Sequence, residues 1–395
     1  MFLSVFFYLI AFLLGVYLIR AHSVLYNKIF LILILSCLGH AAGTYFYSLA
    51  PSDSTTQYFP FASPYFNNLG TEFAATVVWY IRYFLTGDSV LETFYFFSAF
   101  SFLGSVSWYV LYLKFLKNLN LSGQSLAWPA LILMCWPSWL IFTAGMVKDS
   151  LCFLLIPTIF INYLNLIDQK NRTWNGISLF IALLLMTMIR PYLLMLMLFA
   201  ALIYKIRNLK SFNIWYLISA ILLIIIAFWV ADWVLKTQGR FETVSLNSIA
   251  QKSALQQNLQ EQGTDFYMPS INPLIRLFLL PYSLVMNLCF PLIYLARNLM
   301  GYMASLENIL LVSLIGITWK FKNQVKKMFS AKPHLSFLFY FFVIGMAFLG
   351  IGNTNLGLSM RQKSMYVPAF LIIYCLIYAL RKNAIKNAVK KPIKY

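Results

Sequence analysis

Long apolar runs recur along the whole of this 395-residue chain, and they limit its fold more than any other feature. A run of about 20 apolar residues is the length of helix that crosses the hydrocarbon core of a bilayer. Only 10% of the residues are charged and 61% are hydrophobic, against about 25% and 45–50% in a soluble domain. The sequence therefore predicts an all-α polytopic membrane protein with a single membrane domain, residues 1–395.

Eleven of the runs are predicted to be membrane-spanning helices. They are 2–19, 29–50, 90–113, 126–143, 150–167, 175–189, 191–204, 214–231, 303–319, 335–351 and 365–380. The first run is expected to be a retained span, because no small-residue cleavage site follows it. Segments 175–189 and 191–204 are short and meet at Arg190-Pro191, so they form either two short crossings or one broken crossing. The stretch 274–296 contains two prolines and an arginine, which favours a broken or re-entrant element.

Charge follows the same layout. With the N-terminus outside, twenty of the 30 basic residues fall in inner loops or in the tail 381–395, and ten of the 11 acidic residues fall outside. Because cytoplasmic loops collect Lys and Arg, this asymmetry predicts an outer N-terminus and a cytoplasmic C-terminus. The same bias explains the net charge of +19, so no nucleic-acid partner is expected.

Two outer loops are large, 51–89 and 232–272. In the first, Phe73, Val77, Ile81 and Phe84 follow helical spacing, which predicts an amphipathic helix over 71–85 lying at the membrane surface. The second loop is polar and rich in Gln.

Ionisable residues gather at the predicted outer boundary of the spans. Such residues are costly in lipid and usually face a cavity or a partner. Many cations with few acids suggest an anion site, and the anion expected at a membrane edge is a lipid phosphate or pyrophosphate, which Arg and Lys bind well. The candidate donor-phosphate residues are Lys148, Arg190, Arg276, Arg297, Arg361 and Lys363, supported by Asp149, Glu307 and Tyr58.

Asp53 is the candidate catalytic base. Its carboxylate would take a proton from an acceptor hydroxyl while a sugar leaves its phosphate carrier, and the cations would stabilise the leaving phosphate. The structural alternatives are a turn or cap role for Asp53 in "PSDS" and a helix-end ion pair for Lys148 and Asp149. Five scattered cysteines and three scattered histidines predict neither disulfides nor a zinc site. A divalent cation, Mg²⁺ or Mn²⁺, held by carboxylates is left open.

Three stretches resemble the GT-C superfamily of polyprenyl-phosphate-sugar-dependent glycosyltransferases and related membrane proteins of bacterial surface-polysaccharide clusters. They are "SDSTTQYF" before the amphipathic helix, "PSWLIFTAGMVKDSL", and "GNTNLGLSMRQKSMYVPAFLII" running into the last span. The resemblance implies a GT-C-like fold in the bacterial cytoplasmic membrane and an inverting transfer of a saccharide from a polyprenyl-linked donor. The acceptor would be a glycan or lipid-linked hydroxyl on the outer face. Asp53 would match the loop acid, and Lys148, Arg190 and Arg361 would match the cations that hold the donor phosphate.

Two other functions fit parts of the same pattern. The chain is also similar to Wzy-type polymerases of O-antigen or capsule, whose outer-face arginines and large second-half loop would match 232–272. A transporter or flippase for lipid-linked sugars is the third hypothesis. Transporters place polar residues near the bilayer midplane and show inverted repeats, whereas the polar residues here lie at one side.

Overall fold

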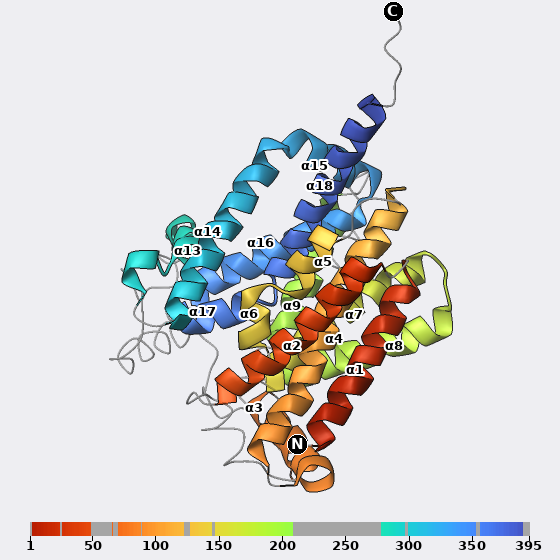
Figure 1. Cartoon of the computed structure of the whole chain (residues 1–395). Coiled ribbons are helices and arrows are strands. Elements are labelled where there is room, and N and C mark those ends of the chain that lie inside the picture. The colour runs from red at the N-terminus through yellow and green to blue at the C-terminus, as the bar shows by residue number, and fades with distance from the viewer. Residues whose placement is uncertain are drawn as a thin grey trace, which may run out of the picture.

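The structure, a computed structural model, is all-helical in the part of the chain it describes. The described residues are 2–23, 26–48, 65, 70–87, 89–121, 127–143, 147–207, 278–296, 299–352 and 356–389. Figure 1 shows a bundle of helices, with the start of the first helix (Phe2–Arg20) at one end and the last turns of the final helix (Val367–Val389) at the other.

The helices are α1 (Phe2–Arg20), α2 (Asn27–Ser48), α3 (Thr71–Ile81), α4 (Val90–Asn118), α5 (Ala127–Met134), α6 (Pro137–Phe142), α7 (Val147–Ile167), α8 (Arg172–Ile189), α9 (Pro191–Arg207), α13 (Leu280–Cys289), α14 (Leu299–Lys320), α15 (Lys322–Ala331), α16 (His334–Gly352), α17 (Leu356–Lys363) and α18 (Val367–Val389). A π-helical turn, η2, covers Arg82–Thr86, and a 3₁₀ turn, η3, covers Ile293–Leu295.

Seven of the described helices are long and apolar enough to cross a membrane: α1, α2, α4, α7, α8, α14 and α18. Shorter apolar helices lie at Leu280–Cys289 and within α16. The prediction of an all-helical protein with several membrane-spanning helices is therefore confirmed. The predicted run 214–231 and the loop 232–272 lie outside the described residues, as do residues 51–64, 66–69 and 88 of the loop 51–89.

The prediction of one spanning helix over 126–143 is wrong, because this run forms two short helices, α5 and α6. The break falls at Cys135 and Trp136, just before Pro137. Proline has no N–H to continue the ladder and prefers the first turn of a new helix, so Pro137 ends α5 and begins α6. Segment 274–296 is broken as expected, with α13 ending before Phe290 and Pro291 and η3 following.

The helix predicted over 71–85 is present as α3 followed directly by η2, and its place at a membrane surface stays a prediction. Val77 and Ile81 pack against a small core that includes Ala74, Ala75 and Val78. Phe73 packs against the main core of the bundle. Phe84 is 69% exposed, although the spacing placed it on the same face. The reason is η2, whose wider turn changes the register after Ile81.

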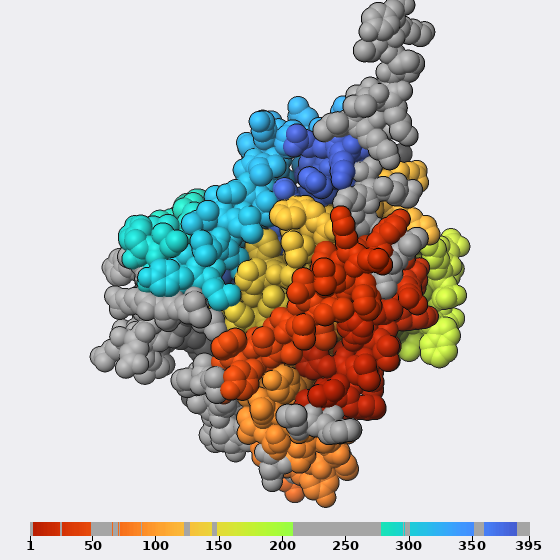
Figure 2. All heavy atoms as spheres, viewed as in Figure 1, coloured from red at the N-terminus to blue at the C-terminus, as the bar shows by residue number. Residues whose placement is uncertain are grey.

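α4 is the central helix of the bundle and packs against α1, α2 and α7. Phe102, Trp108 and Tyr109 on α4 are fully buried. A Cβ at Gly104 would come within 2.9 Å of the carbonyl oxygen of Phe153, so glycine permits the close approach of α4 and α7. In Figure 2 α1 and α2 fill the middle of the visible face, with α5 and α6 between them and the C-terminal helices.

Basic helix ends gather at one end of the bundle, which we call the basic end. Here Lys114 of α4 and Lys170 both approach Asp168, each at 4.0 Å. The ends of α9 and α16 meet where the Tyr204 hydroxyl contacts His334 Nδ1 at 3.0 Å. The guanidinium of Arg381 on α18 lies 4.0 Å from the ring centre of Phe321.

The opposite end contains the starts of α7 and α18 and all of α17, because α7, α16 and α18 each have their other end at the basic end. α7 has 21 residues. At 1.5 Å per residue its two ends lie about 30 Å apart, the thickness of a bilayer core. A charge at the start of α7 is thus separated from the basic end by one membrane thickness.

Candidate functional site

Asp149, in the first turn of α7, is the centre of a buried ion cluster at this opposite end. Its side chain is 0% exposed. One carboxylate oxygen pairs with Nη2 of Arg190, and the other lies 3.1 Å from Nε of Arg361. An acid in the first helical turn is also favoured by the helix dipole. One carboxylate therefore joins guanidinium groups from two segments that are far apart in the sequence.

The backbone at Arg190 explains how this side chain reaches the cluster. Arg190 ends α8 with an extended conformation, φ −147° and ψ 77°, and Pro191 begins α9. A residue before proline avoids helical geometry, so the Arg190-Pro191 pair breaks the helix and turns the guanidinium away from α8. Its Nη1 donates a hydrogen bond to the Tyr192 hydroxyl at 2.8 Å. The predicted break at Arg190-Pro191 is therefore confirmed as the boundary between α8 and α9.

The short helix α17 attaches to three other helices through alternate residues. The Ser359 hydroxyl donates to Asn287 Oδ1 on α13, Arg361 pairs with Asp149 on α7, and Lys363 Nζ donates to Asn308 Oδ1 on α14 at 2.7 Å. Residues four apart share a face of a helix, whereas the residue midway between them points away. Ser359 and Lys363 therefore face α13 and α14, and Arg361 faces the Asp149 cluster.

Glu307 and Lys363 form a second charged group on the α14 side of α17. Both are buried, at 5% and 1% exposure, and they interact electrostatically. Burial lowers the pKa of Lys363 to about 8, an effect that the nearby Glu307 carboxylate opposes. Lys363 therefore titrates in a range where a small change of pH alters its charge.

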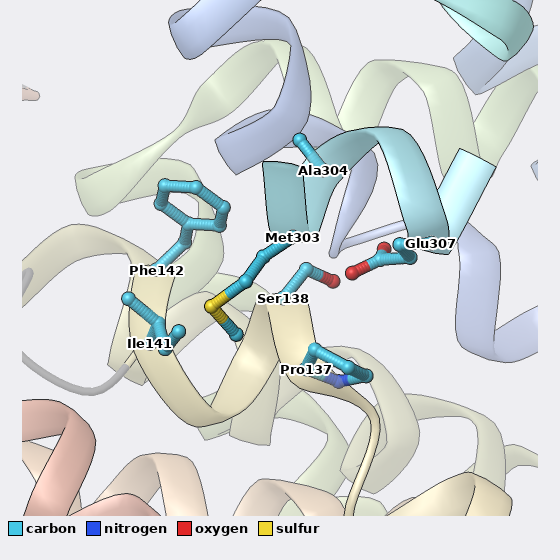
Figure 3. Close-up of a pocket in the computed structure, with 7 residues that line it drawn as sticks. All are labelled: Pro137, Ser138, Ile141, Phe142, Met303, Ala304 and Glu307. Carbon is cyan, nitrogen blue, oxygen red and sulfur yellow. The ribbon is translucent and has the colours of Figure 1, made fainter. Parts of the chain in front are cut away.

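A small hollow opens between α6 and α14 beside Glu307 (Figure 3). Its lining consists of Pro137, Ser138, Ile141, Phe142, Met303, Ala304 and Glu307. Figure 3 shows the Glu307 carboxylate and the Ser138 hydroxyl directed toward each other, with the Met303 side chain alongside. The accessible wall of the hollow is thus apolar, and the buried Glu307 carboxylate lies behind it.

Not every predicted site residue falls in the described part of the chain. Asp53, Tyr58, Arg276 and Arg297 lie outside it. Of the rest, Asp149, Arg190 and Arg361 come together, and Glu307 and Lys363 come together on the other side of α17. Lys148 is half-buried and acts electrostatically on Cys152, one turn along α7.

The charge of the site is positive within the described residues. Two carboxylates, of Asp149 and Glu307, stand against the cations of Lys148, Arg190, Arg361 and Lys363. The carboxylates hold the guanidinium and ammonium groups in place without neutralising all of them. An excess of cations in a buried setting attracts an anion more strongly than the same charges in water would.

Several polar residues of the site are not among the sequence candidates. Asn308 accepts from Lys363 and donates to the carbonyl oxygen of Phe290 at 2.6 Å. Asn287 donates to the Ser283 carbonyl at 2.9 Å and accepts from Ser359. Each asparagine lies within an apolar segment. That placement is itself a signal, because a polar side chain in an apolar run needs a partner.

Comparison of the sequence with protein-family models, with curated proteins and with solved structures finds no match in any of the three. The functional argument therefore depends on the site itself.

Proposed function

We propose that this protein is an integral membrane glycosyltransferase that moves a saccharide from a polyprenyl-(pyro)phosphate donor to an acceptor hydroxyl on the outer face of a bacterial cytoplasmic membrane. The observation that supports it best is the buried, net-positive ion cluster in which Arg190 and Arg361 share the single carboxylate of Asp149. It lies one membrane thickness from the basic end, so by the positive-inside rule it would be on the outer side.

In the proposed sugar transfer, the described residues would bind the donor phosphate and stabilise its negative charge. The acceptor oxygen bonds to the anomeric carbon as its proton passes to a base, for which Asp53 is the candidate. The bond between the anomeric carbon and the phosphate oxygen breaks, and its electron pair leaves with the phosphate. Positive charge placed beside that oxygen stabilises it as negative charge develops. Arg190 and Arg361 would provide this charge, each held in position by Asp149.

The test is binding of undecaprenyl phosphate to the full chain in nanodiscs, with undecaprenol as the ligand that lacks only the phosphate. Wild type is expected to prefer the phosphate lipid. Arg190→Lys and Arg361→Lys keep the charge but lose the planar fork. Each should weaken phosphate-lipid binding by roughly tenfold, the effect of losing one charge-assisted hydrogen bond.

Lys322→Ala, at the start of α15 near the basic end, is the matched control and should bind as wild type does. Asp53→Asn should bind the phosphate lipid normally and fail to transfer sugar. Equal binding of undecaprenol and undecaprenyl phosphate by wild type would refute the proposal, because the phosphate would then go unrecognised.

A further inference from the structure

α15 is a short basic helix at the basic end of the bundle. It has 10 residues, KNQVKKMFSA, and follows α14 after one non-helical residue, Phe321. At 1.5 Å per residue it is about 15 Å long, half the thickness of a bilayer core, so it cannot cross the membrane. It contacts α14, α16 and α18, and Figure 1 shows it at the end of the bundle from which α18 emerges.

One face of α15 is apolar and attaches the helix to the bundle. Met328 is buried, and Val325 and Phe329 pack against the main core. The ring centres of Phe329 and of Phe339 on α16 are 5.8 Å apart. Residues three and four apart lie on the same side of a helix, so Val325, Met328 and Phe329 form one continuous apolar face. The protein itself therefore covers the apolar face of α15.

The other face of α15 carries positive charge that is not balanced within the protein. Lys322, Lys326 and Lys327 are exposed, and none of them is in an ion pair with a described residue. Residues 308–395 of the sequence contain no Asp or Glu. Like charges four residues apart repel each other on a helix, as Lys322 and Lys326 do here. An anion from outside the protein would relieve this repulsion.

The residues around α15 indicate where that anion lies. Trp319, in the last turn of the candidate span α14, is 72% exposed, and Lys322 Nζ lies 5.6 Å from its ring centre. Tryptophan is enriched where membrane helices reach the lipid headgroups. The Arg381 guanidinium, 4.0 Å from the ring centre of Phe321, adds a cation of α18 beside the start of α15. The lysine face thus begins at the level of the headgroups.

We propose that the lysine face of α15, together with Arg381, binds the anionic headgroups of phospholipids in the leaflet at the basic end. Each ammonium group attracts a headgroup phosphate as a point charge, and the attraction grows with the number of cations near the surface. The bound headgroups would hold the connection between α14 and α16 against the leaflet. This surface lies at the opposite end from the Asp149 cluster, and the inference does not depend on the proposed function.

The first measurement locates the lipid on the wild-type chain. The full chain is placed in nanodiscs of phosphatidylcholine that contain a small fraction of phosphatidylglycerol with a photoreactive diazirine near its headgroup. Crosslinks are mapped by mass spectrometry, and phosphatidylcholine with the same diazirine is the matched reagent. Crosslinks from phosphatidylglycerol should concentrate at Trp319–Phe329, whereas those from phosphatidylcholine should spread over the lipid-facing helices. The same distribution for both reagents would overturn the inference.

The second measurement compares the affinities of fluorescent phosphatidylglycerol and phosphatidylcholine for protein in a nonionic detergent. Wild type should prefer phosphatidylglycerol, and about 0.5 M salt should weaken this preference by screening. The α15 variant, Lys322→Gln/Lys326→Gln/Lys327→Gln, should bind phosphatidylglycerol about tenfold more weakly. The matched control has the same net charge and changes three exposed lysines of the basic end that lie on other segments: Lys117→Gln/Lys170→Gln/Lys205→Gln. It should stay within about twofold of wild type.

Equal losses of affinity in the two triple variants would also refute the inference, because total charge and not α15 would then attract the lipid. Equal affinity of wild type for the two lipids would refute it as well. In nanodiscs that contain phosphatidylglycerol, the α15 variant should bind undecaprenyl phosphate as wild type does, since phosphatidylglycerol then occupies the lysines. Failure of wild type to bind undecaprenyl phosphate would remove the proposed function and leave this inference unchanged.

Discussion

Replacing Asp149 with asparagine keeps the size of the side chain and removes the charge that two guanidinium groups share. Asp149 is 0% exposed, and the side chains of Arg190 and Arg361 are 6% and 16% exposed. Removing one partner of a buried ion pair costs about 3–5 kcal/mol, because the remaining charge stays buried and uncompensated. With about 2–4 °C per kcal/mol for a large domain, Asp149→Asn should lower the melting temperature by roughly 10 °C.

Asp168→Asn is the matched control. Asp168 is also a carboxylate beside two cations, but it is 30% exposed and both lysines are 4.0 Å away. Lys114 is itself buried, but it also donates a hydrogen bond to Asn165 and so keeps a partner in the variant. Long ion pairs with a partly exposed carboxylate contribute about 0–1 kcal/mol, so the melting temperature should fall by no more than about 3 °C. The assay is thermal unfolding of purified protein in one detergent, followed by tryptophan fluorescence.

Two further variants test whether the cluster acts as a unit. Arg361→Met should cost less than Asp149→Asn, since Asp149 keeps its pair with Arg190. The double variant should cost less than the sum of the single ones, because residues in one ion network are coupled. A melting temperature for Asp149→Asn within about 2 °C of wild type, or a larger loss for Asp168→Asn, would refute the reasoning.

Three more predictions concern packing, pH and topology. Gly43→Ala should destabilise the protein by about 1–3 kcal/mol, since its Cβ would overlap the carbonyl oxygen of Leu140. Gly316→Ala, which has nothing within 4 Å of the added Cβ, should melt as wild type does. The affinity for undecaprenyl phosphate should fall as pH rises through about 8, where Lys363 loses its proton. Lys363→Gln should bind this lipid more weakly than wild type, with the same affinity at pH 7 and pH 9. If the affinity of this variant falls with pH as much as that of wild type, Lys363 does not have this role. In intact cells, a membrane-impermeant maleimide should modify Tyr65→Cys, at a residue 74% exposed, and should modify Tyr395→Cys only after lysis; the reverse pattern would invert the proposed topology.

The sequence predicts the class of this fold well because the signal for a spanning helix is strong. A run such as 90–113 can only be satisfied in lipid as a helix, and α4 covers it. Proline at position 137 favours a break in the helix, but the continuous apolar run around it predicts a single span over 126–143. The exposure of Phe84 was not predictable, since η2 leaves no clear mark in the residue spacing.

For the candidate site, the sequence identifies single charged residues that need a partner, but it does not predict which of them contact one another. Asp149, Arg190 and Arg361 stand out because a charge beside an apolar run needs a partner. Their pairing depends on how α7, α9 and α17 pack, which periodicity does not encode. Asn308 was not predicted, because an uncharged amide is a weaker signal than a charge, although its Oδ1 accepts a hydrogen bond from the Lys363 ammonium group.

The attachment of α17 through Ser359, Arg361 and Lys363 bears on how the chain is assembled in the membrane. During synthesis Asp149 and Arg190 emerge close together and can pair early, whereas Arg361 emerges only after α9, residues 208–277 and α14. Until α17 is inserted, Asp149 on α7, Asn287 on α13 and Asn308 on α14 lack the contacts that α17 makes with them. Insertion of α17 would therefore be the step that fixes these three helices together. A truncated chain that lacks α17 would leave Asn287 and Asn308 without their α17 partners and Asp149 with one guanidinium instead of two.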